Sequence, residues 1–249
     1  MKQVVPNILT ASNLFCGMLA LIMVWQNQLW MVVALLIAAG LFDFFDGFVA
    51  RILSVSSPVG KELDSLADAV TFGVVPGFIM ARLIAEAGDH AFPFEGMWQA
   101  GTNWLWMTGL LIGVYSVVRL ARFNLDTRQS DTFFGLPTPS NTMFVLGLWI
   151  LFSVHHDSAL IQILNQPWIL AGISLISSMM LLMNVRLLAL KFQSFGMKGN
   201  EYRYLLVLGS VLSLIILGWS ALCFIILYYL ALSLINNLQE TGRLSGIVA

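Results

Sequence analysis

Charged residues are scarce in this chain of 249 residues, of which only 10% are Asp, Glu, Lys or Arg. An ordinary soluble domain contains about 25% of them. Hydrophobic residues make up 59% of the chain, and the mean hydropathy is +0.86. This composition excludes a soluble domain and predicts an integral membrane protein. The formal net charge of −1 says little about partners, and we expect no nucleic acid among them.

Cysteine is also rare, with only Cys16 and Cys223, each in an apolar segment. We interpret both as small buried residues rather than as a disulfide or a metal-binding pair. The N-terminus carries Lys2 but lacks a short apolar core followed by a small-residue cleavage site. We therefore expect no cleaved signal, and the first apolar segment should remain as a membrane span.

Long apolar runs dominate the sequence, and they predict an all-α, polytopic transmembrane helix bundle. A bilayer core requires about 20 apolar residues per helix, which gives about eight spans. The predicted spans are 8–25, 30–53, 62–85, 103–122, 138–154, 167–189, 203–219 and 220–238. Only Gly218–Ser220 separates the last two, so one re-entrant hairpin or a miscount stays open there.

Basic residues are missing from alternate connections between these spans. Eleven of the 12 Lys and Arg lie at a terminus or in the connections that follow the second, fourth and sixth spans, and Arg82 is the exception. Cytoplasmic connections of membrane proteins carry the excess of Lys and Arg. Both termini are therefore expected to be cytoplasmic, in a plasma membrane of bacterial or archaeal type.

Four aspartates stand out within this apolar background: Asp43, Asp46, Asp64 and Asp68. An ionisable side chain at the centre of a membrane helix costs about 2.5–3.5 kcal/mol on insertion scales. Helical spacing places the first two aspartates on one face, and places the last two on one face of the next helix. Pro58 marks the start of that second helix. The two acidic faces can therefore turn toward each other.

Four carboxylates in an apolar setting cannot all remain ionised unless cations lie between them. Ligand sets made only of oxygen suit hard divalent ions such as Mg²⁺ or Mn²⁺. The pattern predicts a carboxylate-bridged metal site with two ions, Mg²⁺ or Mn²⁺. Asp43 lies eight residues before Arg51, so the site is expected roughly 12 Å above the cytoplasmic end of its helix.

Two alternatives to a metal site stay open for the four aspartates. Ion pairing with Arg51 and Lys61 is one of them, and it leaves the summed charge of the cluster negative. An ion-coupled transporter is another, although no internal repeat supports it.

Eight positions at fixed spacing resemble the signature of the CDP-alcohol phosphatidyltransferases. They are Asp43, Asp46, Gly47, Ala50, Arg51, Gly60, Asp64 and Asp68. The resemblance implies two divalent metals held by the four aspartates against the diphosphate of a CDP-linked lipid. It also implies that Asp68 acts as general base or contacts the second metal.

The remaining signature positions are implied to line the site for nucleotide and phosphate: Gly47, Ala50, Arg51 and Gly60. A P-N-x-x-T stretch near the N-terminus is similar to one that lines the nucleotide pocket in this family, which adds Asn7 and Thr10. A capped interfacial helix is the alternative for that stretch.

Two further motifs resemble the phosphatidylserine synthase branch: R-L-A-R-F-N at 119–124 and F-F-G-L-P-T-P at 133–139. The implied reaction transfers the phosphatidyl group from CDP-diacylglycerol to the hydroxyl of L-serine and releases CMP. Arg119, Arg122 and Asn124 are the candidates for holding the acceptor or phosphate. The chain departs from the branch at 140–142, where Ser-Asn-Thr replaces small residues. Acceptors such as glycerol 3-phosphate or inositol stay open.

This resemblance covers residues 1–142. We expect a single integral membrane domain, 1–249, with the catalytic core in 1–154 and additional transmembrane helices in 155–249. CDP-diacylglycerol, L-serine, membrane lipids and a second copy of the chain are the expected partners, since homodimers are common in the family.

Overall fold

The computed structural model describes residues 4–55, 57–88, 104–125, 135–185, 187–188, 196 and 200–245. Within these residues every regular element is a helix, which confirms the all-α prediction. The elements are α1 (Val4–Trp25), α2 (Leu29–Ile52), α3 (Pro58–Ala69), the π-helix η1 (Val70–Val74), α4 (Val75–Ala87), the 3₁₀-helix η2 (Trp104–Trp106), α5 (Met107–Leu125), α6 (Thr138–Val154), α7 (Ala159–Leu164), α8 (Pro167–Leu182), α9 (Glu201–Leu217), the 3₁₀-helix η3 (Gly218–Ser220) and α10 (Ala221–Ser245).

Five helical stretches in the described residues are long and apolar enough to cross a membrane: Val4–Trp25, Leu29–Ile52, Pro58–Ala87, Trp104–Leu125 and Glu201–Gln239. Two shorter apolar helices, α6 and α8, add to them. The last stretch reverses at Gly218, whose φ of +57° favours glycine. Tyr228 Oη then donates to Leu205 O over 3.2 Å, so α9 and α10 run antiparallel. Each of the eight predicted spans therefore coincides with one helix or helical stretch.

Several boundaries differ from the predicted span bounds by a few residues, and the structure explains two of them. The helix of the third span starts at Pro58, as the proline predicted, and so extends beyond the span bound of 62, because Ser57 caps the helix and its Oγ accepts from Gly60 N over 2.9 Å. The sixth ends at Leu182 rather than at residue 189, since Met183 is already extended. Both cysteines are free, with Cys223 buried and Cys16 half-buried.

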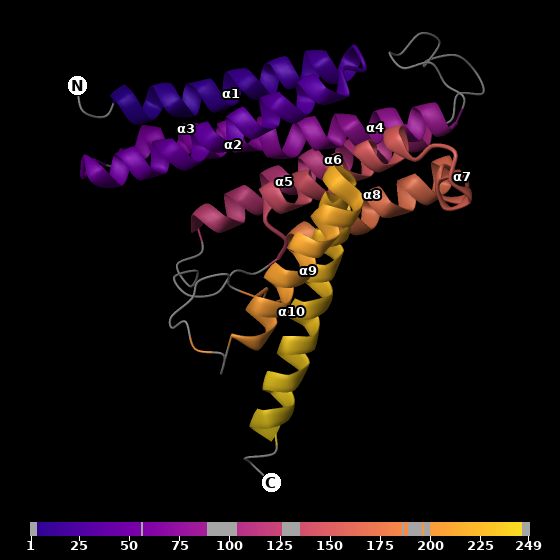
Figure 1. Cartoon of the computed structure of the whole chain (residues 1–249). Coiled ribbons are helices and arrows are strands. Elements are labelled where there is room, and N and C mark those ends of the chain that lie inside the picture. The colour runs from indigo at the N-terminus through magenta and orange to yellow at the C-terminus, as the bar shows by residue number, and fades with distance from the viewer. Residues whose placement is uncertain are drawn as a thin grey trace.

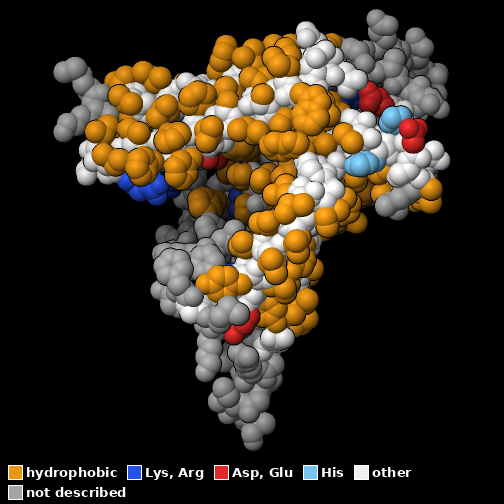
Figure 2. Space-filling view, in the orientation of Figure 1, with side chains coloured by type: hydrophobic (Ala, Val, Ile, Leu, Met, Phe, Trp, Pro, Cys, Tyr) orange, Lys and Arg blue, Asp and Glu red, His pale blue; other side chains and the backbone are white. Residues whose placement is uncertain are grey.

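The helices pack in sequence around the central helix α4 (Figure 1). The antiparallel pair α1–α2 covers one side, α5 and α8 pack together on another, and α10 joins the bundle through α6. The α9–α10 pair crosses the remaining helices steeply. Helix α4 is buried on all sides, with Ile79, Met80 and Ile84 at the centre of the core. Much of the outer surface is hydrophobic, with charged side chains near helix ends and in a recess (Figure 2). Such a surface suits a lipid environment.

Arg82, the basic residue outside the charge pattern, has a structural partner at the end of α1. Its guanidinium donates to Val24 O over 2.7 Å and to Trp25 O over 3.3 Å, and it also pairs with Glu86. Carbonyl groups at a helix C-terminus lack intrahelical donors and attract cations. Arg82 therefore fastens α1 to α4 at the end opposite the aspartates.

The π-helix η1 lies in the middle of the third span, directly after the last aspartate. Val75 N–H bonds Val70 O, five residues back, as a π turn requires. Pro76 has no N–H, so it cannot bond the carbonyl of Phe72. Thr142 Oγ1 on α6 lies 3.1 Å from Phe72 O and 2.9 Å from Thr138 O, so its hydroxyl is shared between the irregular turn and its own helix. The irregular turn is therefore stabilised from outside its own helix.

Candidate active site

The candidate site lies between α1, α2 and α3. Helix α1 packs closely on α2 and also on α3, whereas α2 and α3 pack little on each other. Two acidic helices held apart by a third leave space between their facing side chains. That arrangement explains how four carboxylates fit into a small volume without direct helix contact.

Three of the four aspartates converge there. Carboxylate oxygens of Asp43, Asp64 and Asp68 lie within 4.8 Å of one another, and all three side chains are half-buried. Asp43 comes from α2, while Asp64 and Asp68 come from successive turns of α3. The predicted facing of the two acidic helix faces is therefore observed.

The fourth aspartate, Asp46, is the most buried, with 6% of its surface exposed. Its Oδ2 accepts a hydrogen bond from Thr10 Oγ1 over 2.5 Å, and Thr10 Oγ1 also lies 3.1 Å from Pro6 O. Thr10, predicted as a pocket residue, thus also holds one of the carboxylates in place.

Asp68 is held by a residue that the sequence analysis did not single out. Asn13 on α1 is fully buried, and its Nδ2 donates to Asp68 Oδ1 over 3.1 Å. Thr71 Oγ1 in turn lies 3.3 Å from the backbone oxygen of Asn13, which links η1 to the same contact. Asn13 Oδ1 is buried without a hydrogen-bond partner. The buried hydrogen bond from Asn13 to Asp68 fixes the orientation of that carboxylate.

A signal for Asn13 exists in the sequence. The buried residues of α1 recur at spacings of four and three: Pro6, Thr10, Asn13, Gly17, Ala20 and Val24. That spacing defines the seam along which one helix packs on its neighbours. A polar residue on the seam of an apolar helix must face a polar partner.

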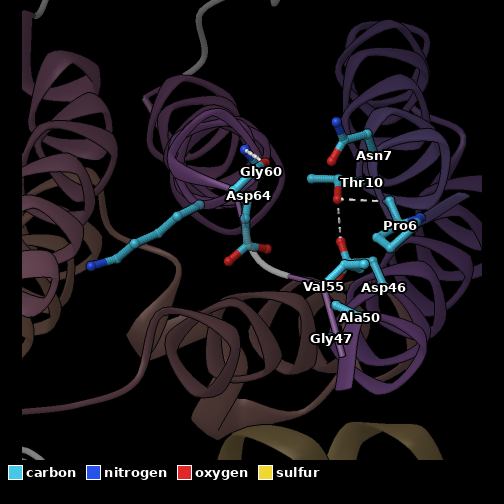
Figure 3. A pocket seen from close by; sticks show the side chains of 11 residues that line it. Pro6, Asn7, Thr10, Asp46, Gly47, Ala50, Val55, Gly60 and Asp64 are labelled. Atoms are coloured by element: carbon cyan, nitrogen blue, oxygen red, sulfur yellow. Dashed lines mark hydrogen bonds between the residues drawn. The ribbon is translucent and has the colours of Figure 1, made fainter. Parts of the chain in front are cut away.

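A cavity of about 260 Å³ opens beside the aspartates. Pro6, Asn7 and Thr10 of α1 line one side, opposite Gly60 and Asp64 of α3 (Figure 3).

Helix α2 forms the third wall of the same cavity with Asp46, Gly47 and Ala50. The turn between α2 and α3 contributes Val55 and Ser57, and Lys61 of α3 lies at the edge. Five of the six predicted nucleotide-site residues therefore share one cavity: Asn7, Thr10, Gly47, Ala50 and Gly60.

The two glycines differ in what surrounds them. A Cβ on Gly47 would meet no atom within 4 Å, so this position faces open space in the cavity. A Cβ on Gly60 would lie 2.9 Å from Ser57 Oγ and 3.2 Å from Asn7 Oδ1. Gly60 is thus required by the helix cap itself, while Gly47 leaves room for a bound molecule.

Arg51, the sixth predicted residue, lies in the last turn of α2 with an exposed side chain, outside the cavity lining. Neither Arg51 nor Lys61 forms an ion pair with any of the four aspartates in the part of the chain that the structure describes. The cluster is therefore not neutralised by its own neighbouring cations, and the ion-pair alternative has no support.

The three candidate acceptor residues at the end of α5 separate in space. Arg119 is partly buried, lies close enough to Asp68 for an electrostatic interaction, and has a buried Nε without a partner. Arg122 is exposed. Asn124 contacts α3, since its Nδ2 donates to Ser65 Oγ over 2.7 Å and its backbone oxygen accepts from Lys61 Nζ over 3.2 Å. Asn124 thus anchors α5 to α3.

Residues 135–137, the Gly-Leu-Pro part of the second motif, hold the start of α6 in place. Gly135 has a φ of +75°, and a Cβ there would lie 2.6 Å from Leu181 O, so only glycine fits. Gly135 N donates to Val185 O over 3.2 Å, and Leu136 N donates to Met180 O over 3.0 Å. These bonds fix the helix that carries Thr142, which contacts the turn after Asp68. Residues 126–134, including the start of this motif, lie outside the described residues.

The donor set at the cluster fits divalent metal. It consists of carboxylate oxygens, the ligands of Mg²⁺ and Mn²⁺. Two ligands on opposite sides of a Mg²⁺ ion are about 4 Å apart, comparable to the 4.8 Å limit on the oxygens of Asp43, Asp64 and Asp68. The fold and the site together define a helical membrane protein with a cluster of carboxylates, suited to divalent metal, beside a cavity.

Known proteins agree with this description. The family model for CDP-alcohol phosphatidyltransferase matches residues 3–190. The chain therefore belongs to the CDP-alcohol phosphatidyltransferase family.

Similar curated proteins come from bacteria and archaea. The chain is 34% identical over 153 residues to the CDP-diacylglycerol–serine O-phosphatidyltransferase of Helicobacter pylori strain J99, covering 61% of this chain and 59% of that protein. It is 33% identical over 135 residues to the protein of the same name from Bacillus subtilis strain 168, covering 54% of this chain and 69% of that protein.

The archaeal protein of that name from Methanocaldococcus jannaschii is 27% identical over 160 residues, covering 64% of this chain and 67% of the relative. The match thus spans 59% of the length of the Helicobacter protein and 67% of the Methanocaldococcus one.

Proposed function

We propose that the protein transfers the phosphatidyl group of CDP-diacylglycerol to the hydroxyl of L-serine, giving phosphatidylserine and CMP. The observation that carries the proposal is the convergence of Asp43, Asp64 and Asp68 beside a cavity lined by the other family-signature residues. The names of the bacterial and archaeal relatives support serine as the acceptor.

The four aspartates are the proposed ligands of two divalent ions, Mg²⁺ or Mn²⁺. When bound, such ions neutralise the diphosphate and stabilise CMP as the leaving group. Asp46, oriented by Thr10, and Asp64 face the cavity in which the cytidine and its diphosphate would lie. Gly47 provides the space for that group.

Asp68 is the proposed general base. A serine hydroxyl is a weak nucleophile, so a carboxylate must take its proton as its oxygen attacks the lipid-bearing phosphorus. The new bond forms between the serine oxygen and phosphorus, and the bond from phosphorus to the CMP oxygen breaks. Asn13 holds the carboxylate of Asp68 in one orientation during this step.

Arg119 is the proposed contact for the serine carboxylate or a phosphate oxygen, because its partly buried guanidinium group, with a buried Nε that has no partner, lies near Asp68. Arg122 and Asn124 remain proposed members of the acceptor side. Arg51 is proposed to contact phosphate from the rim of the cavity.

The wider arrangement is also a proposal. Residues 1–154 would form the catalytic core, residues 155–249 would add transmembrane helices, and the chain would act as a homodimer. The acidic site would face the cytoplasm, with both termini on that side, because the Lys and Arg of the sequence gather at those connections.

The experiment is an acceptor screen with purified full-length protein and radiolabelled CDP-diacylglycerol. With Mn²⁺ or Mg²⁺, L-serine should give phosphatidylserine and one CMP per product, and a strong chelator should abolish both. Product from glycerol 3-phosphate or inositol alone would keep the chemistry and overturn serine as acceptor. Absence of CMP release with every acceptor would overturn the enzyme, and uptake into sealed vesicles without CMP release would indicate a transporter.

A further inference from the structure

A second cavity, also of about 260 Å³, lies at the end of the bundle opposite the aspartates. The ends of α4 and α6, the short helix α7 and the turn between α1 and α2 enclose it. Its apolar lining is buried, with at most 8% of the surface of each residue exposed: Leu83, Trp149, Phe152 and Ile161. This cavity shares no lining residue with the acidic one.

The rest of the lining is polar and exposed: Asn27, Glu86, Ser153, His156, Gln162 and Asn165. Glu86 gives this rim a negative charge, and none of the lining residues is Lys or Arg. A hollow lined by charge of one sign concentrates ions of the other. The cavity therefore disfavours anions such as phosphate and favours cations.

Glu86 has one carboxylate oxygen that its ion pair does not use. Oε1 pairs with Arg82, whereas Oε2 has no hydrogen-bond partner among the described residues. Arg82 is 4% exposed, lies outside the lining, and also donates to the carbonyl groups of Val24 and Trp25. The side chain of Glu86 remains 40% exposed. Since a carboxylate offers about four acceptor sites, Glu86 can accept from a second cation without losing Arg82.

The surroundings of the cavity are acidic as well. The sequence contains no Lys or Arg between residues 83 and 118 or between 143 and 185. The acidic residues within those two ranges are Glu86, Asp89, Glu95 and Asp157. Acidic and histidine side chains gather near α7 at this end of the molecule (Figure 2). A cation that approaches this end meets no opposing surface charge from these segments.

Exposed tryptophans place the same end at a membrane interface. Trp25, Trp30, Trp104 and Trp168 lie at helix ends, and between 44% and 65% of their surface is exposed. Tryptophan is enriched where the bilayer meets water. The cavity therefore lies at the level of lipid head groups, within reach of dissolved molecules.

Among organic cations, the lining fits a primary ammonium group. Such a group has three N–H donors, and the rim offers the free Oε2 of Glu86 and the side-chain oxygens of Asn27, Gln162 and Asn165. A quaternary ammonium group has no N–H donor and binds on the open faces of aromatic rings. The aromatic residues of this cavity are buried, so they present no such faces.

A divalent metal ion fits less well. Such ions require several carboxylate or carbonyl oxygens in a close shell. In the described part of the chain, the group of metal-binding side chains that converge closely enough is Asp43, Asp64 and Asp68, at the other end.

We propose that this cavity binds a primary ammonium group, held by Glu86 and carried by a lipid head group or by a free amine. The site does not rest on the reaction proposed above, because it lies at the opposite end of the bundle. It is a second binding site, with a positively charged ligand where the acidic cavity takes an anionic one with metal.

The test uses the full-length protein in nanodiscs with equal amounts of phosphatidylethanolamine and phosphatidylcholine that carry the same acyl chains. The first lipid ends in a primary ammonium group and the second in a trimethylammonium group. Native mass spectrometry counts the lipids that remain bound after release. The unmodified protein should retain phosphatidylethanolamine about tenfold over phosphatidylcholine, since hydrogen bonds between charged groups are among the stronger ones.

A second arm distinguishes a lipid from a free amine. In nanodiscs of phosphatidylcholine alone, saturation-transfer NMR compares the binding of dissolved ethanolamine and choline. Enrichment of phosphatidylethanolamine in the first arm assigns the site to a lipid head group. Binding of ethanolamine but not choline, without enrichment of the lipid, assigns it to a free amine. Neither effect in the unmodified protein would overturn the proposal.

Two variants separate the charge from the space. Glu86→Gln removes the charge but keeps an oxygen that accepts from Arg82, and Ser153→Trp fills the cavity from α6. Each should reduce the preference for the primary amine to about equality. The matched controls, Glu201→Gln and Val154→Trp, change exposed residues outside the lining and should keep the preference. A preference that survives in either cavity variant would refute the site. CMP release from the same samples reports on the proposed reaction separately.

Discussion

Asn13 Nδ2 lies 3.1 Å from Asp68 Oδ1 and joins the first helix to the third at the centre of the acidic cluster. One turn earlier on the same helix, Thr10 bonds Asp46 of the second helix. Helix α1 carries none of the four aspartates, yet it holds one carboxylate on each of the helices that do. The geometry of the site therefore depends on a helix that the acidic signature does not include.

Replacing Asn13 by Leu should leave the fold intact and slow the reaction. Outer residues that orient metal ligands typically change activity or metal affinity by about 10–100-fold when removed. We expect kcat to fall within that range, the Mn²⁺ concentration for half-maximal rate to rise, and KM for CDP-diacylglycerol to change little. Ser12→Ala, which removes only a bond to Ile8 O on the exposed side of α1, is the control. An unchanged kcat and metal dependence would show that Asn13 is only a packing residue.

Asp68→Asn should separate binding from chemistry. A positioned general base contributes about 10²–10⁴-fold, so turnover should fall by that factor while a fluorescent CDP-lipid still binds. The rate of CMP release measures turnover, and fluorescence anisotropy measures the equilibrium binding of the CDP-lipid. If binding is lost together with turnover, Asp68 serves as a metal ligand rather than as base.

Gly47→Leu should block the cavity without destabilising the protein. The side chain would enter open space, and leucine favours a helix over glycine by roughly 0.5–1 kcal/mol. KM for CDP-diacylglycerol should rise at least about tenfold, with Tm unchanged or slightly higher. Gly172→Leu on α8 is the matched control, since a Cβ there also meets nothing within 4 Å. Equal kinetics in the two variants would show that the substrate does not approach Gly47.

Thr142→Val should destabilise the fold through the π turn. It keeps the volume but removes the hydroxyl that is shared between Phe72 O and Thr138 O. A buried carbonyl left without a donor costs about 1–3 kcal/mol. We expect a lower Tm in a detergent-based thermal unfolding assay. Ser213→Ala removes a hydroxyl bonded only within its own helix, to Gly209 O, and should have a much smaller effect. Similar Tm values would mean that Phe72 finds another donor.

Much of the site could be predicted because the chemistry is local. The spacing of Asp43, Asp46, Asp64 and Asp68 on two neighbouring helices was sufficient to expect their convergence. Asn7 and Thr10 could be placed there only through a resemblance, yet they line the cavity with the signature glycines. The span count followed from hydropathy alone, because lipid requires long apolar helices with internal hydrogen bonds.

Other features could not be predicted because they depend on contacts between distant segments. The hydrogen bond from the Asn124 amide to Ser65 had no signal in the sequence. Arg82 did not fit the distribution of basic residues in the sequence, and its partner, the carbonyl group of Val24 at the end of α1, is seen only in the structure. Side-chain partners more than 50 residues apart leave no periodic trace in a single sequence.

The extra residue in the π turn at Val70–Val74 shifts the phase between the two halves of one span. Before it, α3 is amphipathic and turns its acids toward α1 and α2; after it, α4 is enclosed by apolar neighbours on every side. One residue corresponds to about 100° of rotation about the axis. Deleting a single residue between 70 and 74 would therefore swing Asp64 and Asp68 away from Asn13 while leaving composition and hydropathy almost unaltered. The alignment of these aspartates therefore depends on the number of residues in the membrane helix as well as on their identity.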